Sequence, residues 1–453
     1  MVFSSLPFLF LFLPAVLLIH SLLPGRLRNG FLLLANLIFY AYGEPVYVLL
    51  MLASIVVNDL AARLLQRTQP SFCRKALLIA AVALNLSALG WFKYAPLLAD
   101  TLGLPPVNVA LPIGISFYTF QAMSYVIDVY RGDCRPARRF VDFAAYISLF
   151  PQLIAGPIVR YSDVAAQLQD RSLSAEKFSW GVRMFVIGLA KKVLLANQFA
   201  LLWEQVSANP AGYGTLAAWC ALAAYTLQIY FDFGGYSDMA RGLGAMLGFD
   251  FCINFNYPYL SGSITEFWRR WHISLSSWFR DYVYIPLGGS RKGKARTACN
   301  LMIVWMLTGF WHGAGWNFLF WGFYYGILLL VEKFLLGSRL EKLPRMLRWC
   351  YTMVLVMLGW VFFASPDLSA AWSYLRVLFG GIPGQNAVRL FSWLPLGLAG
   401  VLATTPLAKN IWKRLAASAG MPWLEALLCL TGLLLCTAGL VSGSYNPFLY
   451  FRF

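Results

Sequence analysis

Charged residues are scarce in this chain. Only 12% of its 453 residues are Asp, Glu, Lys or Arg, whereas 60% are hydrophobic and 17% are aromatic. A soluble domain of this size needs a polar surface, so this composition excludes one. Apolar runs of about 18 residues or more recur along the chain. The short alternating strands of an outer-membrane barrel are missing. The sequence therefore predicts an all-α polytopic membrane protein.

Motifs for metals, disulfides and nucleotides are also missing. The eight cysteines form no CxxC pair and mostly lie in apolar segments, and the three histidines are far apart in the sequence. We therefore expect no disulfide framework and no metal site. Neither a P-loop nor a Rossmann fingerprint is present, so a nucleotide-hydrolysing or dinucleotide-dependent enzyme has no support. Because no linker or internal repeat divides the chain, we expect one domain spanning residues 1–453.

The excess of basic residues is explained by membrane topology. A formal net charge of +17 would suggest nucleic acid as the partner of a soluble protein. Here Lys and Arg cluster in alternate short loops between apolar segments, as the positive-inside rule requires of a threaded chain. We expect these loops in the cytoplasm, both termini on the outer side, and no nucleic-acid partner. Residues 5–23 lack a basic n-region and a cleavage site, which predicts a retained first crossing.

The stretch from Gly262 to Trp321 holds two of the three histidines. Ser263 and Glu266 form a capping box that predicts the start of a helix, and Pro286 with the glycines after it predicts the end. Aromatic residues share one face of this helix and basic residues the other, with His272 at the seam, so we expect it to lie along the membrane surface. The apolar face holds Trp268, Trp271, Leu275, Trp278 and Tyr282, and the polar face holds Arg269, Arg270, Ser276, Ser277 and Arg280.

The second half of this stretch predicts a hairpin with His312 at its apex. Gly313, Ala314 and Gly315 follow the histidine and must bend or break the helix. Basic residues flank the apolar segment on both sides, so the chain should enter the membrane from the cytoplasm and return there. Each arm of about 16 residues spans roughly 24 Å, which places His312 well inside a hydrocarbon core about 30 Å thick. Irregular backbone at that depth is tolerated only where it is buried in protein or lines a cavity.

His312 is the strongest catalytic candidate. Apolar surroundings favour a neutral imidazole, which can accept the proton of an attacking hydroxyl as an acyl group is transferred. The alternative is a structural histidine bonded to a backbone carbonyl. His272 is either part of the same site or an interfacial ring with a wet tip. Asp232 is either paired with an arginine or part of the active-site network, and Lys191 and Lys192 are expected to snorkel to the bilayer edge.

Several long motifs resemble the membrane-bound O-acyltransferase family. They are FWRRWHISLSSWFRDYVYIPLGG and FWHGAGWNF, with LPIGISFYTFQ, FPQLIAGPI, YFDFGGYSDMA, NFNYPY and the closing NPFLYFRF elsewhere in the chain. The match is closest to the bacterial branch that includes the alginate O-acetyltransferase membrane subunit. We count roughly 11 to 13 hydrophobic segments. The resemblance implies that they form a bundle with re-entrant and interfacial helices around a central tunnel, in the bacterial inner membrane.

The resemblance implies an acetyltransferase that takes acetyl from cytoplasmic acetyl-coenzyme A and passes it across the membrane for O-acetylation of an extracytoplasmic polysaccharide. Acetyl-coenzyme A is then a substrate, and no bound cofactor is expected. A separate periplasmic or extracellular acyltransferase, the polysaccharide and membrane lipid are the expected partners. The resemblance makes His312 the active-site histidine and His272 a second important one. Further substrate contacts are expected from Trp268, Arg269, Arg270, Trp311 and Asp232.

The closing segment FLYFRF has two readings. Its aromatic residues are typical of an anchor at the membrane interface. Alternatively, the phenol of Tyr450 enters the outer end of the tunnel, is activated by His312 and carries acetyl to the partner as an ester.

The two basic residues Arg269 and Arg270 also have two interpretations. They either follow the positive-inside rule or bind the phosphates of the acyl donor.

Two other functions share some of these features. A lipid or protein O-acyltransferase of the same family would change only the acceptor, and the sequence does not identify the polymer. A transporter or channel would also use broken helices and intramembrane polar residues. It would, however, show paired inverted repeats and a line of ionisable residues, and the sequence has neither. Incorporation of labelled acetyl into polymer distinguishes a transferase from a transporter.

Overall fold

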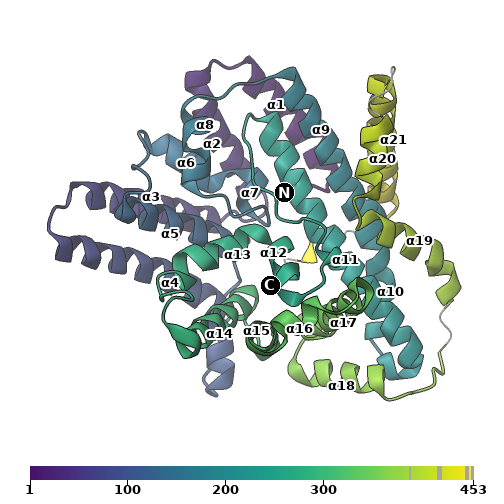
Figure 1. The fold of residues 1–453 in the computed structure, drawn as a ribbon. Helices are drawn as coiled ribbons and strands as arrows, with labels where there is room; N and C mark the ends of the chain where they lie inside the picture. Colours follow the sequence, from purple (N-terminus) through teal and green to yellow (C-terminus); the bar gives the residue numbers. More distant parts are fainter. Residues whose placement is uncertain (387–388, 416–420, 444–447, 450–453) are drawn as a thin grey trace. The chain divides into compact units, whose positions relative to one another are not determined.

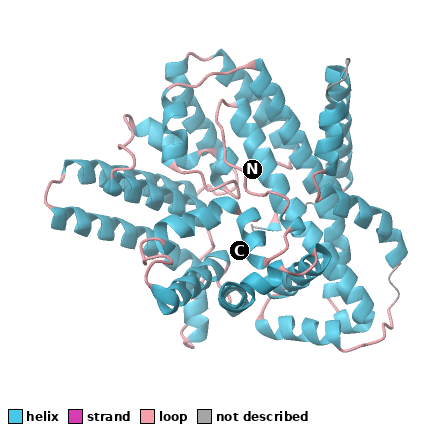
Figure 2. Cartoon of the chain, viewed as in Figure 1, coloured by secondary structure: helices cyan, strands magenta, loops and turns pink. Residues whose placement is uncertain are grey.

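The structure is a computed structural model that describes residues 1–386, 389–415, 421–443 and 448–449. Within these ranges the regular elements are helices and no strand is present (Figures 1 and 2). The all-α fold expected from composition is therefore confirmed. Seven of the described helical stretches are long and apolar enough to cross a membrane. Two shorter apolar stretches, Phe8–Leu22 and Leu390–Ala403, accompany them.

The chain divides into two compact units, each built from two separate stretches of sequence. The first unit combines Met1–Gly188 with Tyr236–Cys252, and the second combines Leu189–Gly235 with Ile253–Phe453. The boundaries fall near the end of α9 (Ala175–Ala190) and inside α11 (Pro210–Met246). The single domain expected from the sequence stays a prediction, and the two units are described separately below.

The first unit contains the N-terminal helices. Besides most of α9 and the end of α11, it has η1 (Phe8–Phe12), α1 (Leu13–Leu22), α2 (Gly25–Ala41), α3 (Tyr47–Arg67), α4 (Ser71–Thr101), α5 (Ile115–Arg131), α6 (Phe140–Ser148), α7 (Phe150–Leu153) and α8 (Tyr161–Gln169). Its core explains the aromatic start of the sequence. Phe8 lies 5.1 Å from Phe3 between ring centroids, and Phe150 lies 5.4 Å from Phe39 and 5.5 Å from Phe12. Offset and edge contacts at these distances stabilise aromatic clusters.

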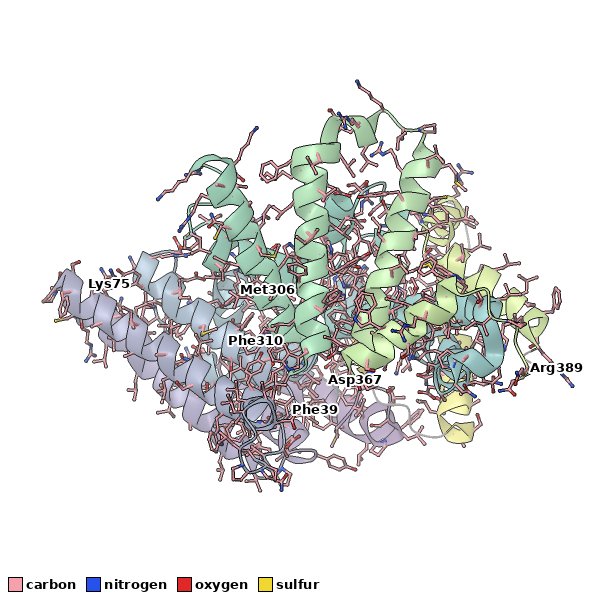
Figure 3. All side chains as sticks on the ribbon, turned by 90° about the horizontal axis from the view of Figure 1, so that it is seen from below. Phe39, Lys75, Met306, Phe310, Asp367 and Arg389 are labelled. Atoms are coloured by element: carbon pink, nitrogen blue, oxygen red, sulfur yellow. The ribbon has the colours of Figure 1, made fainter. Side chains whose placement is uncertain are left out.

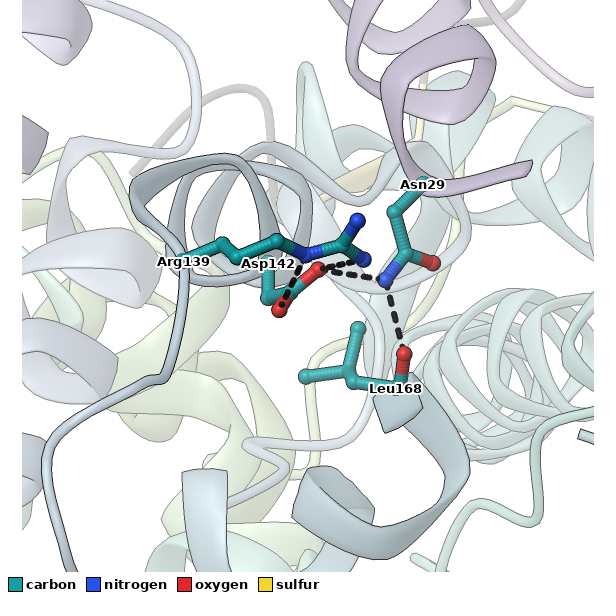
Figure 4. A network of polar contacts seen from close by, with 4 residues as sticks. All are labelled: Asn29, Arg139, Asp142 and Leu168. Carbon is teal, nitrogen blue, oxygen red and sulfur yellow. Dashed lines mark hydrogen bonds and ion pairs between the residues drawn. The ribbon is translucent and has the colours of Figure 1, made fainter. Parts of the chain in front are cut away.

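A buried polar network joins three helices of the first unit (Figure 4). The side-chain amide of Asn29 on α2 donates to the Asp142 carboxylate on α6 and to the carbonyl of Leu168 on α8, both at 2.7 Å. Arg139 donates to the same carboxylate at 2.8 and 3.2 Å. Asp142 is 3% exposed, and a buried carboxylate is tolerated because it is paired and hydrogen-bonded in this way.

The segment from residue 140 to residue 160 is a broken helix, which its two prolines and its glycine explain. α6 ends at Ser148, α7 supplies one further turn, and irregular backbone follows to the start of α8. The Tyr146 hydroxyl supports this backbone by donating to the carbonyl of Val159 at 2.8 Å. A Cβ atom added to Gly156 would lie 2.5 Å from the Cα of Gln152, so only glycine allows this close fold of the chain.

The second unit contains the central stretch with the two histidines. Its elements are η2 (Lys191–Ala196), α10 (Asn197–Ser207), the start of α11, η3 (Pro258–Leu260), α12 (Ile264–Arg270), α13 (Ile273–Phe279), η4 (Arg280–Tyr284), α14 (Gly293–His312), α15 (Trp316–Val331), η5 (Glu332–Leu336), α16 (Gly337–Glu341), α17 (Arg345–Ala364), α18 (Leu368–Phe379), α19 (Leu390–Ala403), α20 (Leu407–Leu415) and α21 (Met421–Ser442). Figure 3 shows Met306 and Phe310 on the last turns of α14. The largest side chains of the unit that are nearly inaccessible to solvent are Trp271, Trp321, Trp360, Tyr225 and Tyr325.

Candidate active site

The helix predicted from Ser263 to Pro286 is interrupted at its middle, and this part of the prediction is wrong. α12 ends at Arg270, and α13 begins at Ile273. His272 between them has φ 44° and ψ 54°, in the left-handed region. Such a conformation is uncommon for a residue other than glycine and requires support from the surroundings. The periodic pattern could not reveal the break, because both halves keep the same helical phase of apolar residues.

Backbone and side-chain hydrogen bonds hold His272 in this conformation. The amide of Ile273 donates to the carbonyl of Asn254 at 3.0 Å, and Ser274 donates through its amide and its hydroxyl to the Asn254 side chain at 3.2 and 2.7 Å. The amide of Asn256 donates to the carbonyl of Arg270 at 2.9 Å. The NFNYPY motif therefore clamps both sides of the helix break. This assigns a structural role to residues that the sequence showed only as part of the family resemblance.

The start of α12 is fixed by two carboxylates. The Ser263 hydroxyl accepts the amide of Glu266 at 3.0 Å, and the Glu266 carboxylate accepts the amide of Gly262 at 2.9 Å. Helix capping at Ser263 is confirmed, although Glu266 reaches one residue further back than a standard capping box. The buried Glu332 accepts the amides of Ile264 and Thr265 at 2.6 and 2.8 Å. Glu332, which follows the last residue of α15, was not predicted as a site residue, and it ties the start of α12 to the end of α15.

The aromatic face predicted for this segment exists, and protein covers it. Its five apolar residues, Trp268, Trp271, Leu275, Trp278 and Tyr282, are all buried. Trp268 packs against the hairpin of α14 and α15, with ring centroids 4.6 Å from Trp305 and 5.5 Å from Trp321. The position of the segment along the membrane surface stays a prediction.

The helix–turn–helix hairpin predicted around His312 is confirmed, whereas its entry into the membrane from the cytoplasm stays a prediction. His312 is the last residue of α14, and α15 begins four residues later at Trp316. A Cβ atom added to Gly309 would lie 2.3 Å from the carbonyl oxygen of Phe318, and one added to Gly322 would lie 2.3 Å from that of Trp305. The two glycines thus let α14 and α15 pack in backbone contact. This close packing holds the end of α14, where His312 lies.

His272 and His312 lie close together inside the second unit. Their ring centroids are 6.3 Å apart, and Trp311 lies 6.0 Å from the first ring and 5.0 Å from the second. His272 is 1% exposed and His312 is 4% exposed. The prediction that His272 is an interfacial ring with a solvent-exposed tip is therefore wrong. Burial lowers the pKa of His272 to about 3, so this ring is neutral in the physiological pH range.

Further aromatic rings enclose the histidine pair. Trp321 and Phe363 lie 5.0 and 5.3 Å from the ring of His312, and Phe233 lies 4.7 Å from the ring of His272. Trp268 reaches this group through Trp321. The arrangement surrounds two imidazoles with apolar surface, which excludes bulk water from any reaction at His312.

Asp232 is paired with Lys192, and two expectations about these residues are wrong. The sequence suggested an arginine as the partner of Asp232 and a snorkelling position for Lys192. Instead, the Lys192 ammonium contacts the Asp232 carboxylate, and both residues are at most 2% exposed. A buried charge requires a partner. Two adjacent lysines inside a long apolar segment were the sequence signal for a buried ion pair. Sequence patterns do not show, however, that one of them meets a carboxylate 40 positions away.

The C-terminal segment docks on this buried pair. The amide of Leu449 donates to the second carboxylate oxygen of Asp232 at 2.7 Å, and the Lys192 ammonium lies 4.7 Å from the ring centroid of Phe448. Phe448 and Leu449 are 1% and 7% exposed. Because Asp232 directly precedes Phe233, the docked segment is tied to the residue that packs on His272. The next residue, Tyr450, lies outside the described residues.

The two arginines predicted as substrate contacts differ in their surroundings. Arg270 forms an ion pair with Glu266 at 2.9 Å and donates to the carbonyl of Asn256 at 3.2 Å. Arg269 is exposed.

Among the described residues, no group of three or more His, Cys, Asp and Glu could hold a metal ion. Of the predicted site residues, the structure brings together His272, His312, Trp268, Trp311 and Asp232, whereas Arg269 lies at the surface.

The comparison with known proteins decides the family. Residues 138–365, which include both histidines, match the membrane-bound O-acyltransferase (MBOAT) family. A probable alginate O-acetylase of Pseudomonas putida is 40% identical to this chain, with 100% of each covered. The chain belongs to the membrane-bound O-acyltransferase family. The resemblance seen in the sequence motifs is thus confirmed, and the protein is a multi-pass membrane enzyme.

Other members of the MBOAT family resemble the chain over most of its length. A probable alginate O-acetylase of Azotobacter vinelandii is 45% identical, with 84% of this chain and 78% of the relative covered. The peptidoglycan O-acetyltransferase of Helicobacter pylori is 35% identical, with 86% of this chain and 81% of the relative covered. These relatives are O-acetyltransferases or acetylases that act on different polymers.

Proposed function

We propose that this MBOAT enzyme transfers acetyl from acetyl-coenzyme A on the cytoplasmic side of the bacterial inner membrane to an extracytoplasmic polysaccharide. The observation that carries the proposal is the buried, aromatic-enclosed pair of His272 and His312 inside the region that matches the family. Alginate is the first polymer to test, because several similar proteins are named as alginate O-acetylases. The peptidoglycan O-acetyltransferase relative makes a cell-wall glycan the second.

His312 acts as the general base in this proposal. In its neutral form the imidazole accepts the proton of the attacking hydroxyl while the oxygen bonds to the acetyl carbon. The carbon–sulfur bond of the thioester then breaks, and the coenzyme A thiolate leaves and takes up the proton that His312 accepted, which returns His312 to its neutral form. His272 stays neutral because burial lowers its pKa to about 3, so it orients the reacting groups and does not supply a proton. Trp268 and Trp311 line the acetyl position.

The C-terminal segment supplies the acceptor hydroxyl in this proposal. Leu449 is bonded to Asp232, which precedes the residue that packs on His272. Tyr450 directly follows Leu449 in the chain, so we assign its phenol as the nucleophile that the tail contributes. The phenol oxygen takes the acetyl group and gives its proton to His312. A periplasmic or extracellular acyltransferase then transfers the acetyl from the phenyl ester to the polymer.

The donor side of the site is assigned to the basic residues near α12. Arg270 is already bonded to Glu266, whereas Arg269 is exposed and available to a phosphate of acetyl-coenzyme A. Acetyl-coenzyme A is a substrate in this scheme. The charge pattern places these residues on the cytoplasmic side and both termini on the outer side, so donor and tail meet the histidine pair from opposite directions.

Reconstituted vesicles test the proposal. Purified enzyme with labelled acetyl-coenzyme A on the side of the basic loops, and alginate with the partner acyltransferase on the other side, should yield labelled polymer. Omission of the partner should stop labelling of the polymer and leave label on the enzyme. Label that accumulates in the lipid fraction would instead identify a lipid acyltransferase, and an enzyme that catalyses no acetyl transfer would fit a transporter.

A further inference from the structure

A pocket of about 440 Å³ lies in the first unit, between the start of α9 and the end of α11. This volume falls within the range of about 300–1,000 Å³ that is typical of small-molecule sites. We call it the α9–α11 pocket. Its aromatic residues are Trp180, Phe249 and Phe251, and its polar residues are Ser174, Glu176, Lys177, Arg241 and Asp250. None of them belongs to the histidine site described above.

Two glycines next to lining residues bring α9 and α11 together at the α9–α11 pocket. A Cβ atom added to Gly181 would lie 2.7 Å from the carbonyl oxygen of Gly242, and one added to Gly242 would lie 2.5 Å from that of Gly181. α9 and α11 therefore cross in backbone contact, which only glycine permits. The residues next to the glycines face each other, and the Arg241 guanidinium lies 5.3 Å from the ring centroid of Trp180.

The location of the α9–α11 pocket along the candidate membrane spans indicates the depth of its ligand. Trp180 lies near the start of the span Ala175–Ser207, and Arg241 lies near the end of the span Pro210–Met246. The ends of two spans thus meet at the pocket, where lipid headgroups are expected. Leu173 and Phe178 beside it are 37% and 44% exposed, and they offer apolar surface to an acyl chain.

The charges around the α9–α11 pocket balance. Lys177 donates to the Asp250 carboxylate at 2.7 Å and to the carbonyl of Gly248 at 3.3 Å, which leaves one of its three protons for a ligand. Arg241 donates through Nε to the carbonyl of Phe251 at 3.4 Å. Asp250 and Glu176 are exposed and supply two carboxylates. Asp238 lies outside the lining, 3.8 Å from the Arg241 guanidinium. Within the lining, an anion alone would meet as many negative as positive groups, whereas a molecule with both charges matches all four.

We propose that the α9–α11 pocket binds the headgroup of a zwitterionic phospholipid with a primary ammonium, as in phosphatidylethanolamine. The phosphate contacts Lys177 and Arg241, and the ammonium contacts Asp250 and Glu176. The acyl chains run over Leu173 and Phe178. This lipid site is separate from the acetyl-transfer function, which it neither requires nor explains.

Lipid titration of the delipidated full-length protein, followed by native mass spectrometry, tests the site. Phosphatidylethanolamine should bind with a Kd about tenfold lower than phosphatidylglycerol, which lacks the ammonium. Lys177→Gln and Arg241→Gln should each weaken phosphatidylethanolamine binding about tenfold, as expected for the loss of a hydrogen bond to a charged group. The control Lys75→Gln, which removes an exposed basic residue on α4 (Figure 3), should leave this Kd unchanged.

A switch of selectivity gives the sharper test. The double substitution Glu176→Gln and Asp250→Asn removes both carboxylates from exposed positions, so the protein should fold normally and its pocket should now prefer phosphatidylglycerol. The proposal is overturned if the double variant keeps the original preference, or if the unchanged protein binds phosphatidylglycerol as tightly as phosphatidylethanolamine. Coenzyme A is the nucleotide probe in the same titration. Its competition with phosphatidylethanolamine at equal concentration would reassign the pocket to the acyl donor and overturn the lipid assignment.

Discussion

The buried pair of Lys192 and Asp232 provides the most informative stability prediction. Its side chains are 3% and 2% exposed, and the carboxylate also accepts the amide of Leu449. Replacement of one partner removes the ion pair and leaves the other charge buried without it. We therefore expect Asp232→Asn and Lys192→Met each to lower the free energy of unfolding by about 3–5 kcal/mol.

The double variant Lys192→Met with Asp232→Leu should be less destabilised than either single variant. Replacing a buried ion pair by apolar residues of similar volume is often neutral or stabilising, by up to about 4 kcal/mol. Here Leu449 also loses its hydrogen-bond acceptor, which costs about 1–3 kcal/mol. The double variant should consequently unfold close to the unchanged protein, and the two single effects should not add.

Thermal unfolding of the protein in detergent measures these effects. An unfolding entropy of about 2.1 cal/mol/K per residue gives a shift of about 1 °C per kcal/mol for a chain of 453 residues. The single variants should therefore melt about 3–5 °C lower. Glu341→Gln, which removes an exposed carboxylate on α16, is the control. A double variant that loses as much stability as both single variants together would refute the assignment of a coupled buried pair.

Three further predictions concern the tail, His272 and the hairpin. Tyr450→Phe keeps the ring but removes the hydroxyl, so polymer acetylation should be lost at a normal protein level, and an active variant would leave the tail as an anchor. Burial lowers the pKa of His272 from 6.5 to about 3, so the stability from its neutral form is complete above about pH 6.5 and is lost as the pH falls toward 3. The melting temperature should then fall more between pH 7 and 5 in the unchanged protein than in His272→Gln, and parallel curves would contradict this. Gly309→Ala places a Cβ atom 2.3 Å from the carbonyl oxygen of Phe318 and should cost about 1–3 kcal/mol in thermal unfolding, whereas Gly30→Ala, with no atom within 4 Å, should cost nothing.

Sequence patterns predicted those features that depend on neighbouring residues. The cap at Ser263, the aromatic face of α12 and α13, and the turn after His312 follow from spacing, glycine and capping chemistry, and the structure contains all three. The family resemblance identified the histidines, and the fold brings their rings to 6.3 Å. This distance could not be predicted from sequence patterns, because 40 residues separate the two positions.

Features that depend on distant residues could not be predicted. The break at His272 requires the carbonyl and side chain of Asn254, and the pairing of Asp232 requires Lys192 from another helix. The docking of Leu449 on Asp232 joins residues 217 positions apart. Each contact replaces water around a buried polar group, and one-dimensional patterns of polarity do not record which groups will meet.

Acetyl transfer by His312→Gln tests the central claim most directly. Purified variant and unchanged protein are compared with labelled acetyl-coenzyme A, the partner acyltransferase and alginate, after gel filtration has shown equal folding. Loss of the general base should lower the rate of acetyl transfer by about 10²–10⁴-fold, because His272, whose ring lies 6.3 Å away, is a weak base with a pKa of about 3. A folded His312→Gln variant that acetylates the polymer at the unchanged rate would contradict the proposed mechanism.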